Sequence, residues 1–306
     1  MLSTAVERYI DLHLAVGYRF RSESDLLRSF ARYAKARGEA VVRSETALAW
    51  AAEGPSAGAR RRRLAVVHRF GQRMQLEDPR HELPPSDTFG PRPPRRTPYR
   101  FTPESIRALL DRTDALGPPG SLRPRTYATL FGLLACAGLR ISEALALRLD
   151  DVSADGLVIR GTKFHKSRLV PLHASCRSAL ESYLVVREQQ ADTDPAVFLS
   201  ERGTGLRYSR VNAIFLRLVR GLGLHPGPGQ PGPRLHDLRH AFAVRSLEQC
   251  SGDRNVVARH MLALSTYLGH ACLASTYWYL QATPQLLAEV ARCSELLATP
   301  TPRGAG

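Results

Sequence analysis

Apolar residues recur at a spacing of three or four along the first 78 residues, and polar residues fill the positions between them. Two rows are Val6, Tyr9, Ile10, Leu14 and then Leu26, Leu27, Phe30, Tyr33. This spacing places the side chains of each row on one face of a helix. A shorter helix is expected over Ser44–Glu53, and another opens at Arg60 and carries Leu64, Val67 and Phe70. The pattern predicts a helical first domain over residues 1–78.

Between residues 79 and 98 the composition changes. Prolines stand at positions 79, 84, 85, 91, 93, 94 and 98, with Arg92, Arg95 and Arg96 among them. Proline has a fixed φ and lacks an N–H group, so no regular element is expected at this density. We predict a semi-rigid basic linker over 79–100, a second domain over 101–298 and a flexible tail over 299–306.

The second domain is predicted to be mostly helical. Thr102 is a suitable N-cap with Pro103 at the first helical position, and Tyr127–Ala137 predicts a buried helix that ends at Gly138. Ser142 is expected to cap a short helix to Leu149. The stretches Leu157–Arg160 and Ser167–Leu172 alternate as strands of a hairpin do. Further helices are expected at 173–190, 209–222, 235–249, 256–268 and 284–297. The expected fold class is mainly α, with one small antiparallel β-sheet in the second domain.

Composition excludes several classes of protein. The chain has 306 residues of which 43% are hydrophobic, enough for buried cores, and no 18-residue apolar window suggests a membrane span. The N-terminus does not resemble a secretory signal. The five cysteines are scattered without a CxxC pair, so neither a disulfide framework nor a zinc site is expected. These features predict a cytoplasmic protein with reduced thiols.

The net charge points to a polyanionic partner. Lys and Arg number 43 against 28 Asp and Glu, a net charge of +15, and nucleic acid is the commonest partner of so basic a chain. GC-rich codon usage, which inflates arginine, is the alternative explanation. Only three residues are lysines, Lys35, Lys163 and Lys166, so the two that lie together in the predicted hairpin stand out.

Several residue types in the second domain suit chemistry on one phosphodiester. Arginines such as Arg140 and Arg239 can hold both non-bridging oxygens in the transition state, and Lys163 can protonate a leaving alkoxide. Histidines can bond an oxygen or accept the proton of a nucleophile, and a tyrosine becomes a nucleophile beside cations and a base. No HExxH or P-loop motif is present and a DxD occurs only once, at Asp192–Asp194, which argues against two-metal nucleases and NTPases. No metal and no cofactor are expected.

Each of these residues has an ordinary structural interpretation when it is taken alone. Arg140 can be a salt-bridge partner, Lys163 a solvent-exposed turn residue, and His236 and Arg239 a solvent-facing pair three residues apart. His270, which follows Gly269, can interact with a helix C-terminus. The order and spacing of the residues together carry the functional interpretation.

In that order and spacing the sequence resembles the tyrosine recombinases of the phage-integrase and Xer type. The matching stretches are CAGLRISEALALRLDDV, GTKFHKSRLVPL, RLHDLRHAFAVR and LSTYLGH followed by STYWYLQATPQLL. The resemblance covers about residues 101–295, and residues 1–78 resemble the core-binding domain of that family less specifically. The TYWYLQATP ending resembles recombinases that transposable elements carry in groups of several genes.

The resemblance implies a role for each matching position. Arg140 is the first catalytic arginine, Lys163 the hairpin lysine, and His236 with Arg239 the HxxR box. His270 is the fifth residue and Tyr279, nine residues later, the nucleophile. The family forms a 3′-phosphotyrosyl link and consumes neither ATP nor metal. Tyr277 is a competing nucleophile, and the long segment 241–269 predicts an inserted loop near Ser251–Arg254.

The resemblance also implies partners. A C-shaped clamp on duplex DNA that carries specific recombination sites is expected, with four like or related protomers exchanging the helix 284–297, and with nucleoid association when the chain is bound to DNA. Helix packing within one protomer is the alternative for 284–297. The residues expected to contact phosphates are Arg60, Arg61, Arg62, Arg63, Arg69, Arg73, Arg95, Arg96 and Lys166.

Other functions stay open at this stage. One is a DNA-binding accessory protein of a recombination complex whose active site has decayed. A type IB topoisomerase and a basic RNA-binding protein are two more. The two-domain size and the Xer-like motifs disfavour the first, and the second lacks a convincing RNP-like or GxxG signature.

Overall fold

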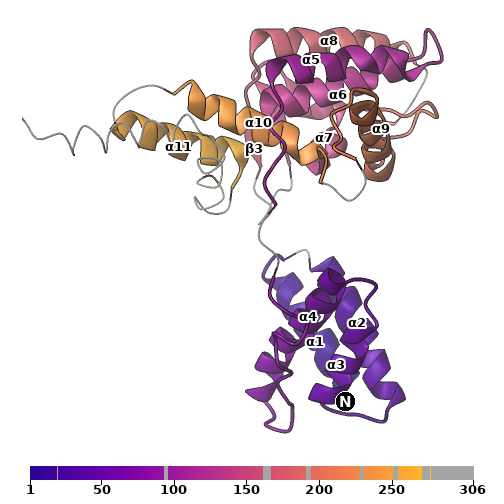
Figure 1. Ribbon diagram of the computed structural model, residues 1–306, viewed down its shortest axis with the longest axis vertical. Coiled ribbons are helices and arrows are strands. Elements are labelled where there is room, and N and C mark those ends of the chain that lie inside the picture. Colours follow the sequence, from indigo (N-terminus) through magenta and orange to yellow (C-terminus); the bar gives the residue numbers. More distant parts are fainter. Residues whose placement is uncertain are drawn as a thin grey trace, which may run out of the picture. The chain divides into compact units, whose positions relative to one another are not determined.

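The computed structural model describes residues 1–18, 20–92, 96–160, 167–190, 194–227, 231–250, 254–270 and 276. The chain forms two compact units, Met1–Arg96 and Thr97–Gly306 (Figure 1). Each unit has a hydrophobic core of its own. Among the described helices, none combines the length and the apolarity that a membrane crossing requires.

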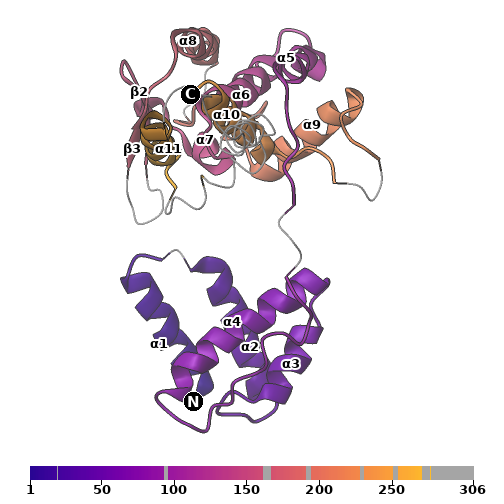
Figure 2. The same cartoon turned by 60° about the vertical axis from the view of Figure 1, so that its left-hand side comes forward.

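The first unit is the predicted helical domain. Its helices are α1 (Leu2–Ala15), α2 (Arg21–Ala36), α3 (Ser44–Ala52) and α4 (Ala57–Gln75) (Figure 2). The apolar faces of these helices meet in a core that includes Leu27, Phe30, Trp50, Leu64 and Phe70. Helix α4 begins three residues before Arg60, because the side chain of Ser56 accepts a hydrogen bond from the Ala59 N–H and caps it.

The beginning of the proline-rich segment packs on the first unit. The Glu82 N–H donates to the Val42 carbonyl at 2.9 Å, and His68 Nδ1 lies 2.7 Å from the Pro84 carbonyl. His81 is buried with its Nδ1 accepting from the Val42 N–H at 3.0 Å. Where composition predicts a linker from residue 79, residues 81–84 are therefore held against α4, and the division between the units falls after Arg96.

The second unit is mostly helical, as predicted. Its helices are α5 (Pro103–Asp111), the 3-10 turn η1 (Arg112–Leu116), α6 (Arg123–Ala137), α7 (Ile141–Ala146), the 3-10 turn η2 (Leu149–Asp151), α8 (Ala174–Glu188), α9 (Tyr208–Gly221), α10 (Leu235–Glu248) and α11 (Arg254–Leu268). Helix α6 lies at the centre and packs against α5, α8 and α10. Leu130, Phe131 and Leu134 of α6 are buried, which confirms the prediction from its apolar sequence.

A small antiparallel sheet lies in this unit. Strands β1 (Val152–Ser153), β2 (Gly156–Ile159) and β3 (Arg168–Val170) pair in the order β1-β2-β3. The predicted hairpin is β2 with β3, in which Ile159 pairs with Arg168. The sequence analysis did not identify β1, because two residues carry too little alternation to be recognised.

Helix α7 differs from its prediction at both ends. Arg140, and not Ser142, is the N-cap, and the helix ends at Ala146 instead of Leu149. The Arg140 N–H donates to the Glu143 carboxylate at 2.9 Å, so an acidic side chain three residues on sets the start. The chain then extends through Leu147, whose carbonyl bonds the Val197 N–H at 2.9 Å. This pairing ends the helix.

Helices α10 and α11 share a second, smaller core. Val244 and Leu247 of α10 pack with Met261, Leu264 and Leu268 of α11. Helix α11 starts at Arg254, so the predicted inserted loop near Ser251–Arg254 overlaps a helical residue, and residues 251–253 lie outside the described ones. Most of the length of the segment 241–269 is thus helix.

We predict that Gly138→Ala destabilises the second unit. Gly138 ends α6 with a φ of +58°, and a Cβ there would overlap the Phe242 ring and lie 3.1 Å from Leu268 Cδ2. The left-handed backbone and the overlap together cost about 2–3 kcal/mol of unfolding free energy, measured by urea denaturation. Gly132→Ala in the same helix is the control. Its Cβ meets nothing closer than 3.9 Å, so equal or higher stability is expected. Equal losses in both variants would contradict the argument.

Candidate active site

Two helices of the second unit begin in the same way and carry the predicted site residues. In α7 the Glu143 carboxylate accepts from the Arg140 N–H, and in α10 the Asp237 carboxylate accepts from the Arg234 N–H at 2.9 Å. A carboxylate in the first turn satisfies an otherwise unpaired N–H group and suits the positive end of the helix dipole. These starts place Arg140 at the N-cap of α7, and His236 and Arg239 near the start of α10.

Arg239 joins the ends of two helices. Its Nη1 donates to the Gly138 carbonyl at 2.6 Å, and its Nη2 donates to the Leu268 carbonyl at 2.7 Å. The side chain is only 1% exposed. The carbonyls at the C-termini of α6 and α11, which lack partners within their own helices, are thus used to hold a buried guanidinium.

Glu143 lies at the centre of three arginines. Arg140 Nη1 approaches its Oε1 at 2.6 Å, Arg168 donates from Nη1 and Nη2 to both oxygens at 3.0 and 2.9 Å, and Arg239 Nη1 is 3.9 Å away. The Glu143 side chain is 9% exposed. Burial by itself would raise the pKa of Glu143, but the hydrogen bonds from Arg168 and Arg140 lower it to about 2. Glu143 is therefore charged at any pH at which the protein works.

His270 completes the group. Its Nε2 lies 3.2 Å from Arg239 Nη2, and because an arginine can only donate, Nε2 is the acceptor. The ring proton of the neutral histidine is then on Nδ1, which donates to Thr276 Oγ1 at 2.7 Å. Burial and the repulsion of Arg239 and Arg140 lower the pKa of His270 to about 4. Burial and Arg239 also lower the pKa of His236, although this residue keeps exposed surface. Both histidines are neutral near pH 7.

The group carries an excess of positive charge, and one of its arginines is partly exposed to solvent. Three guanidinium groups surround one carboxylate, and the side chains of Arg168 and Arg239 are 14% and 1% exposed. The Arg140 side chain is 35% exposed while its Nη2 bonds the Gly269 carbonyl at 2.7 Å. A partly exposed arginine backed by buried cations can bind a phosphate oxygen. Throughout the described ranges, no three His, Cys, Asp or Glu side chains are grouped as metal ligands would be.

The structure brings four of the six predicted catalytic residues together. Arg140 bonds the carbonyl of Gly269, the residue before His270, and Arg239 bonds the His270 ring. His236 is close enough to His270 to lower its pKa. The other two predicted residues, Lys163 and Tyr279, lie outside the described residues. So do Tyr277, Lys166, Arg95 and the predicted helix 284–297.

The arginines at the start of α4 are bonded within the first unit. Arg60 donates to the Gly54 carbonyl at 3.0 Å, Arg61 to the Phe89 carbonyl at 3.2 Å and Arg62 to Ser22 Oγ at 2.6 Å. The Arg63 guanidinium lies over the Trp50 ring at 4.2 Å from its centre, a cation–π contact. Arg63 thus has a structural role in the first unit, whereas Arg60 and Arg62 also stay exposed.

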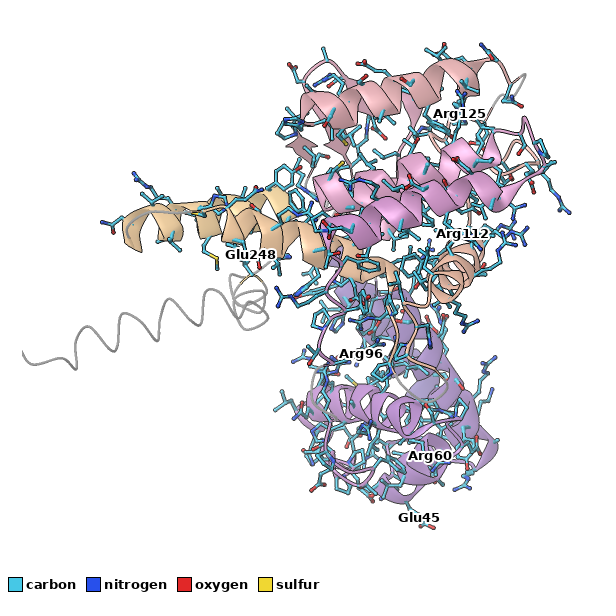
Figure 3. The ribbon with its side chains drawn as sticks, turned by 45° about the horizontal axis from the view of Figure 1, so that its top comes forward. Glu45, Arg60, Arg96, Arg112, Arg125 and Glu248 are labelled. Carbon is cyan, nitrogen blue, oxygen red and sulfur yellow. The ribbon has the colours of Figure 1, made fainter. Side chains whose placement is uncertain are left out.

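The other predicted DNA contacts differ in exposure. Arg69 and Arg73 are exposed on α4, and Arg73 Nη2 lies 3.3 Å from Glu77 in an ion pair of one helical turn. Arg96 is half-buried at the boundary between the units. Figure 3 labels Arg60 and Arg96 on the side-chain view.

A basic helix surface was missed by the sequence analysis. Arg207 at the N-cap of α9 and Arg210, Arg217 and Arg220 within it are exposed, and none forms an ion pair with a described carboxylate. Arg112 lies beside the end of the same helix, 3.7 Å from where a Cβ of Gly221 would be (Figure 3). Arginine spacing along the helix was the available signal.

Three further residues at the site were also missed or given a lesser role. Neither Glu143, Arg168 nor Thr276 was predicted to be a site residue. Their contacts join residues that are distant in the sequence, so spacing alone contains no signal for Arg168. The position of Glu143 three residues after Arg140 was the one local sign.

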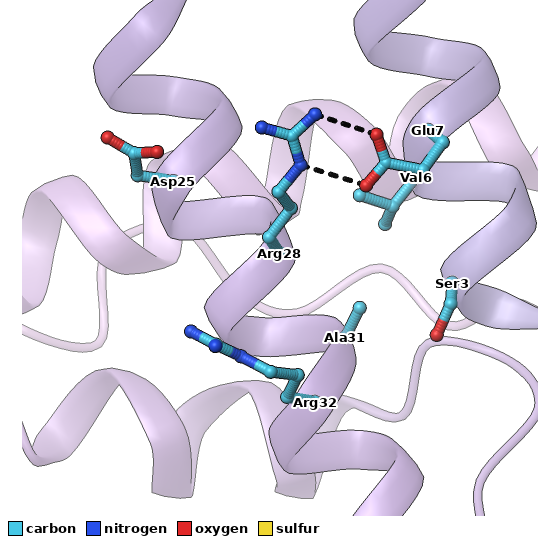
Figure 4. Close-up of a pocket in the computed structure, with 7 residues that line it drawn as sticks. All are labelled: Ser3, Val6, Glu7, Asp25, Arg28, Ala31 and Arg32. Carbon is cyan, nitrogen blue, oxygen red and sulfur yellow. Dashed lines mark hydrogen bonds and ion pairs between the residues drawn. The ribbon is translucent and has the colours of Figure 1, made fainter.

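A cavity in the first unit has a different character. It lies between α1 and α2, measures about 570 Å³ and is lined by residues that include Glu7, Asp25, Arg28 and Arg32 (Figure 4). Arg28 donates from Nε and Nη2 to both oxygens of Glu7, at 2.9 and 2.8 Å. Acidic and basic side chains thus balance each other, and the lining shows no preference for an anion.

Comparison with known sequences gives one consistent result. Residues 99–285 match the Phage integrase family. A putative integrase/recombinase of Sinorhizobium fredii is 40% identical over 302 residues, covering 94% of this chain and 95% of that protein. Tyrosine recombinase XerC of Chromobacterium violaceum is 33% identical over 299 residues, covering 94% and 93%.

Solved structures share the fold. The integrase of transposon Tn1549, in complex with transposon right end DNA, matches with a TM-score of 0.66 at 16% identity, covering 96% of this chain and 99% of that one. The site-specific recombinase XerH bound to its palindromic difH substrate matches with a TM-score of 0.64 at 19% identity, covering 90% and 79%.

We predict that His270 makes the protein less stable in acid. Its pKa of about 4 in the folded chain lies below the ordinary value of 6.5, so between these values the unfolded chain binds more protons. Stability therefore falls as the pH is lowered from 6.5 to 4, by about 1 kcal/mol from this half-exposed ring. Urea denaturation at pH 7 and pH 4.5 measures the loss. His270→Gln should show a smaller loss, and an unchanged loss would assign the effect to other groups, His236 first.

Proposed function

Because the chain belongs to the phage integrase family of tyrosine recombinases, we propose that it is a site-specific DNA recombinase that cleaves and rejoins strands through a 3′-phosphotyrosyl intermediate. The observation that carries this proposal is the grouping of Arg140 and Arg239 beside the Glu143 carboxylate, with His270 bonded to Arg239, His236 close enough for Arg239 to lower its pKa, and excess positive charge reaching solvent at Arg140. Such a group suits a phosphate that gains charge in its transition state.

In this mechanism the Tyr279 hydroxyl attacks the scissile phosphorus. A tyrosine with an ordinary pKa near 10 needs a base, and His236, neutral and partly exposed, can accept its proton. Arg140 and Arg239 stabilise the pentacoordinate phosphorane, and His270 holds Arg239 by accepting a hydrogen bond from it. One P–O bond forms as another breaks, so the bond energy is retained and neither ATP nor a metal ion enters the balance.

The leaving 5′-oxygen needs a proton, and Lys163 is proposed to supply it. An arginine keeps its protons at any working pH, whereas a lysine can release one when nearby cations lower its pKa. Strand β3, which ends the hairpin in which Lys163 was predicted, begins at Arg168, and Arg168 bonds Glu143 inside the site. The 5′-hydroxyl then attacks the phosphotyrosyl link of a partner strand and rejoins the DNA.

Duplex DNA is the proposed partner, and the exposed arginines of each unit are proposed to bind its backbone. In the first unit these include Arg62 and Arg69 on α4, and in the second they include Arg210 and Arg217 on α9. Phosphate contacts of this kind supply affinity with little sequence information. A lambda integrase solved as a tetramer on a Holliday junction shares the fold with a TM-score of 0.58, which supports a tetrameric assembly here.

A mobile genetic element is the proposed setting. The TYWYLQATP stretch resembles recombinases of transposable elements, and a transposon integrase is among the structures of the same fold. The alternative is an accessory DNA-binding protein with a decayed site. The partly exposed Arg140 beside the buried Arg239 favours an active site, because the excess positive charge of the group reaches solvent where a phosphate can bind it.

We expect Tyr279→Phe to abolish the covalent adduct while DNA binding stays within about twofold, because only a hydroxyl is removed and the phosphate contacts remain. The substrate is a duplex whose sequence the wild-type chain has selected from a random pool by binding. It carries a nick near the cleaved bond, so that the freed fragment is lost and the covalent adduct is trapped. Adduct is measured on denaturing gels and binding by fluorescence anisotropy.

Tyr277→Phe is the matched control and should form adduct at the wild-type level. Adduct from Tyr279→Phe together with none from Tyr277→Phe would transfer the nucleophile to Tyr277. Tight DNA binding by the wild type with no adduct on any substrate would favour the accessory protein.

We expect Lys163→Arg to slow cleavage at least a hundredfold, because the variant loses its proton donor. A 5′-bridging phosphorothiolate substrate should restore most of the rate, since a thiolate leaves without protonation. Single-turnover cleavage of both substrates measures the effect.

Lys166→Arg is the control, with little change on either substrate. Rescue by the phosphorothiolate in Lys166→Arg instead of Lys163→Arg would assign the donor role to Lys166.

A further inference from the structure

Arg168 has no role in the mechanism above, yet its guanidinium makes three hydrogen bonds at the site. It is the first residue of β3, and its side chain is 14% exposed. Its Nη1 and Nη2 donate to Glu143 at 3.0 and 2.9 Å, and its Nε donates to the Tyr267 carbonyl at 2.9 Å. One guanidinium thus ties β3 to the start of α7 and to the last turn of α11.

The contacts of Arg168 are directed at the protein. Besides Glu143 and Tyr267, its guanidinium lies against Gly269, where a Cβ would come within 2.8 Å of Nη1. Gly269 has a φ of +65° and precedes His270. A side chain at position 269 would therefore displace Arg168. The glycine lets the Arg168 guanidinium pack against the backbone of the residue that precedes His270.

Arg168 and Arg140 share one carboxylate. Glu143 accepts two hydrogen bonds from Arg168 as a fork and one from the Arg140 guanidinium. A pair in which both ends form two parallel hydrogen bonds is the strongest geometry of an arginine and a carboxylate. Arg168 is therefore a stronger partner of Glu143 than the Arg140 guanidinium, which forms one bond. Without Arg168, Arg140 would be the one guanidinium still hydrogen-bonded to Glu143 among the described residues, with Arg239 3.9 Å away, and Glu143 would draw Arg140 inward.

We propose that Arg168 is a positioning residue for strand cleavage: by binding Glu143 as a fork, it keeps the Arg140 guanidinium anchored at one edge and available to the scissile phosphate at the other. This inference rests on the proposed recombinase function. It gives Arg168 a part in the reaction without contact to the reacting atoms.

The proposal has an electrostatic consequence. The charged groups that face Glu143 are Arg140 from the start of α7, Arg168 from β3 and Arg239 from α10, while His236 and His270 lie around the same arginines. The Arg168 hydrogen bond is the largest influence that lowers the pKa of Glu143, against a burial that raises it. Loss of Arg168 therefore raises that pKa, and protonated Glu143 releases Arg140.

The first arm of the test uses the full chain without DNA. Carbon-13 NMR of labelled Glu carboxyls follows the titration of Glu143, whose signal is assigned by its loss in Glu143→Gln. The wild-type midpoint is expected near 2, and Arg168→Gln should raise it by at least one pH unit. Arg168→Lys, which keeps the charge but not the fork, should give a smaller rise and serves as a second variant if the first is poorly folded.

The second arm measures single-turnover cleavage on the selected nicked duplex, from pH 8 down to one pH unit below the midpoint that Arg168→Gln shows in the first arm. At pH 8 Arg168→Gln should cleave about tenfold more slowly than the wild type, because Arg140 is misplaced. Below the raised midpoint its rate should fall by about tenfold more per pH unit than that of the wild type, a second acidic limb in addition to the one that protonation of His236 gives to both chains. The double variant Arg168→Gln, Glu143→Gln should lack this second limb.

Arg123→Gln is the matched control. Arg123 pairs with Glu201 at 3.1 Å and is 15% exposed, close to the 14% of Arg168, but belongs to α6 away from the site. It should change neither the Glu143 midpoint nor the pH profile.

The outcomes separate the two proposals. An unchanged Glu143 midpoint, or a loss of rate in Arg168→Gln that is the same at every pH, would overturn the positioning role while the recombinase function stands. A second outcome is that the wild type forms no adduct while Arg168→Gln still raises the Glu143 midpoint. It would overturn the recombinase function and the role of Arg168 in cleavage, and would leave only the electrostatic link between Arg168 and Glu143.

Discussion

The buried carboxylate of Glu143 is the constraint on which the candidate site depends. It accepts from the backbone N–H and guanidinium of Arg140 and from the fork of Arg168, and it lies 3.9 Å from Arg239. Three guanidinium groups gathered around one carboxylate repel one another, and the repulsion is strong because two of them are largely removed from water. One fully ionised carboxylate among them offsets that repulsion, and the net charge left over is what a phosphate can bind.

Helix ends supply the rest of the support. The C-terminal carbonyls of α6 and α11, at Gly138 and Leu268, hold Arg239, and the Gly269 carbonyl holds Arg140. Each carbonyl lacks a partner in its own helix, so binding a guanidinium satisfies both groups at once. Since backbone carbonyls are neutral, they fix the arginines in place without cancelling the charge that the proposed reaction needs.

The high arginine content therefore has at least two uses. Arg63 stacks on Trp50, and the buried Arg187 donates to the Ala196 carbonyl at 3.0 Å, so these arginines contribute to folding. Others, such as Arg69 and Arg217, lie exposed on helices where a polyanion can reach them. The net charge of +15 by itself overstates the surface available to DNA, because part of it is buried among carbonyls and rings.

Local sequence determined the helices and several of their ends: apolar spacing marked α2 and α6, Thr102 with Pro103 started α5, and Gly138 ended α6. The order of the motifs identified the family, and with it Arg140, Arg239 and His270 as site residues. Only the tertiary structure decided that Glu143 starts α7 and links the arginines, and that Arg168 and Thr276 support Glu143 and His270. Periodicity reports on neighbours within a few residues. The contact of Gly138 with Arg239 spans 101 positions and that of Glu143 with Arg168 spans 25, so packing alone brings these groups together.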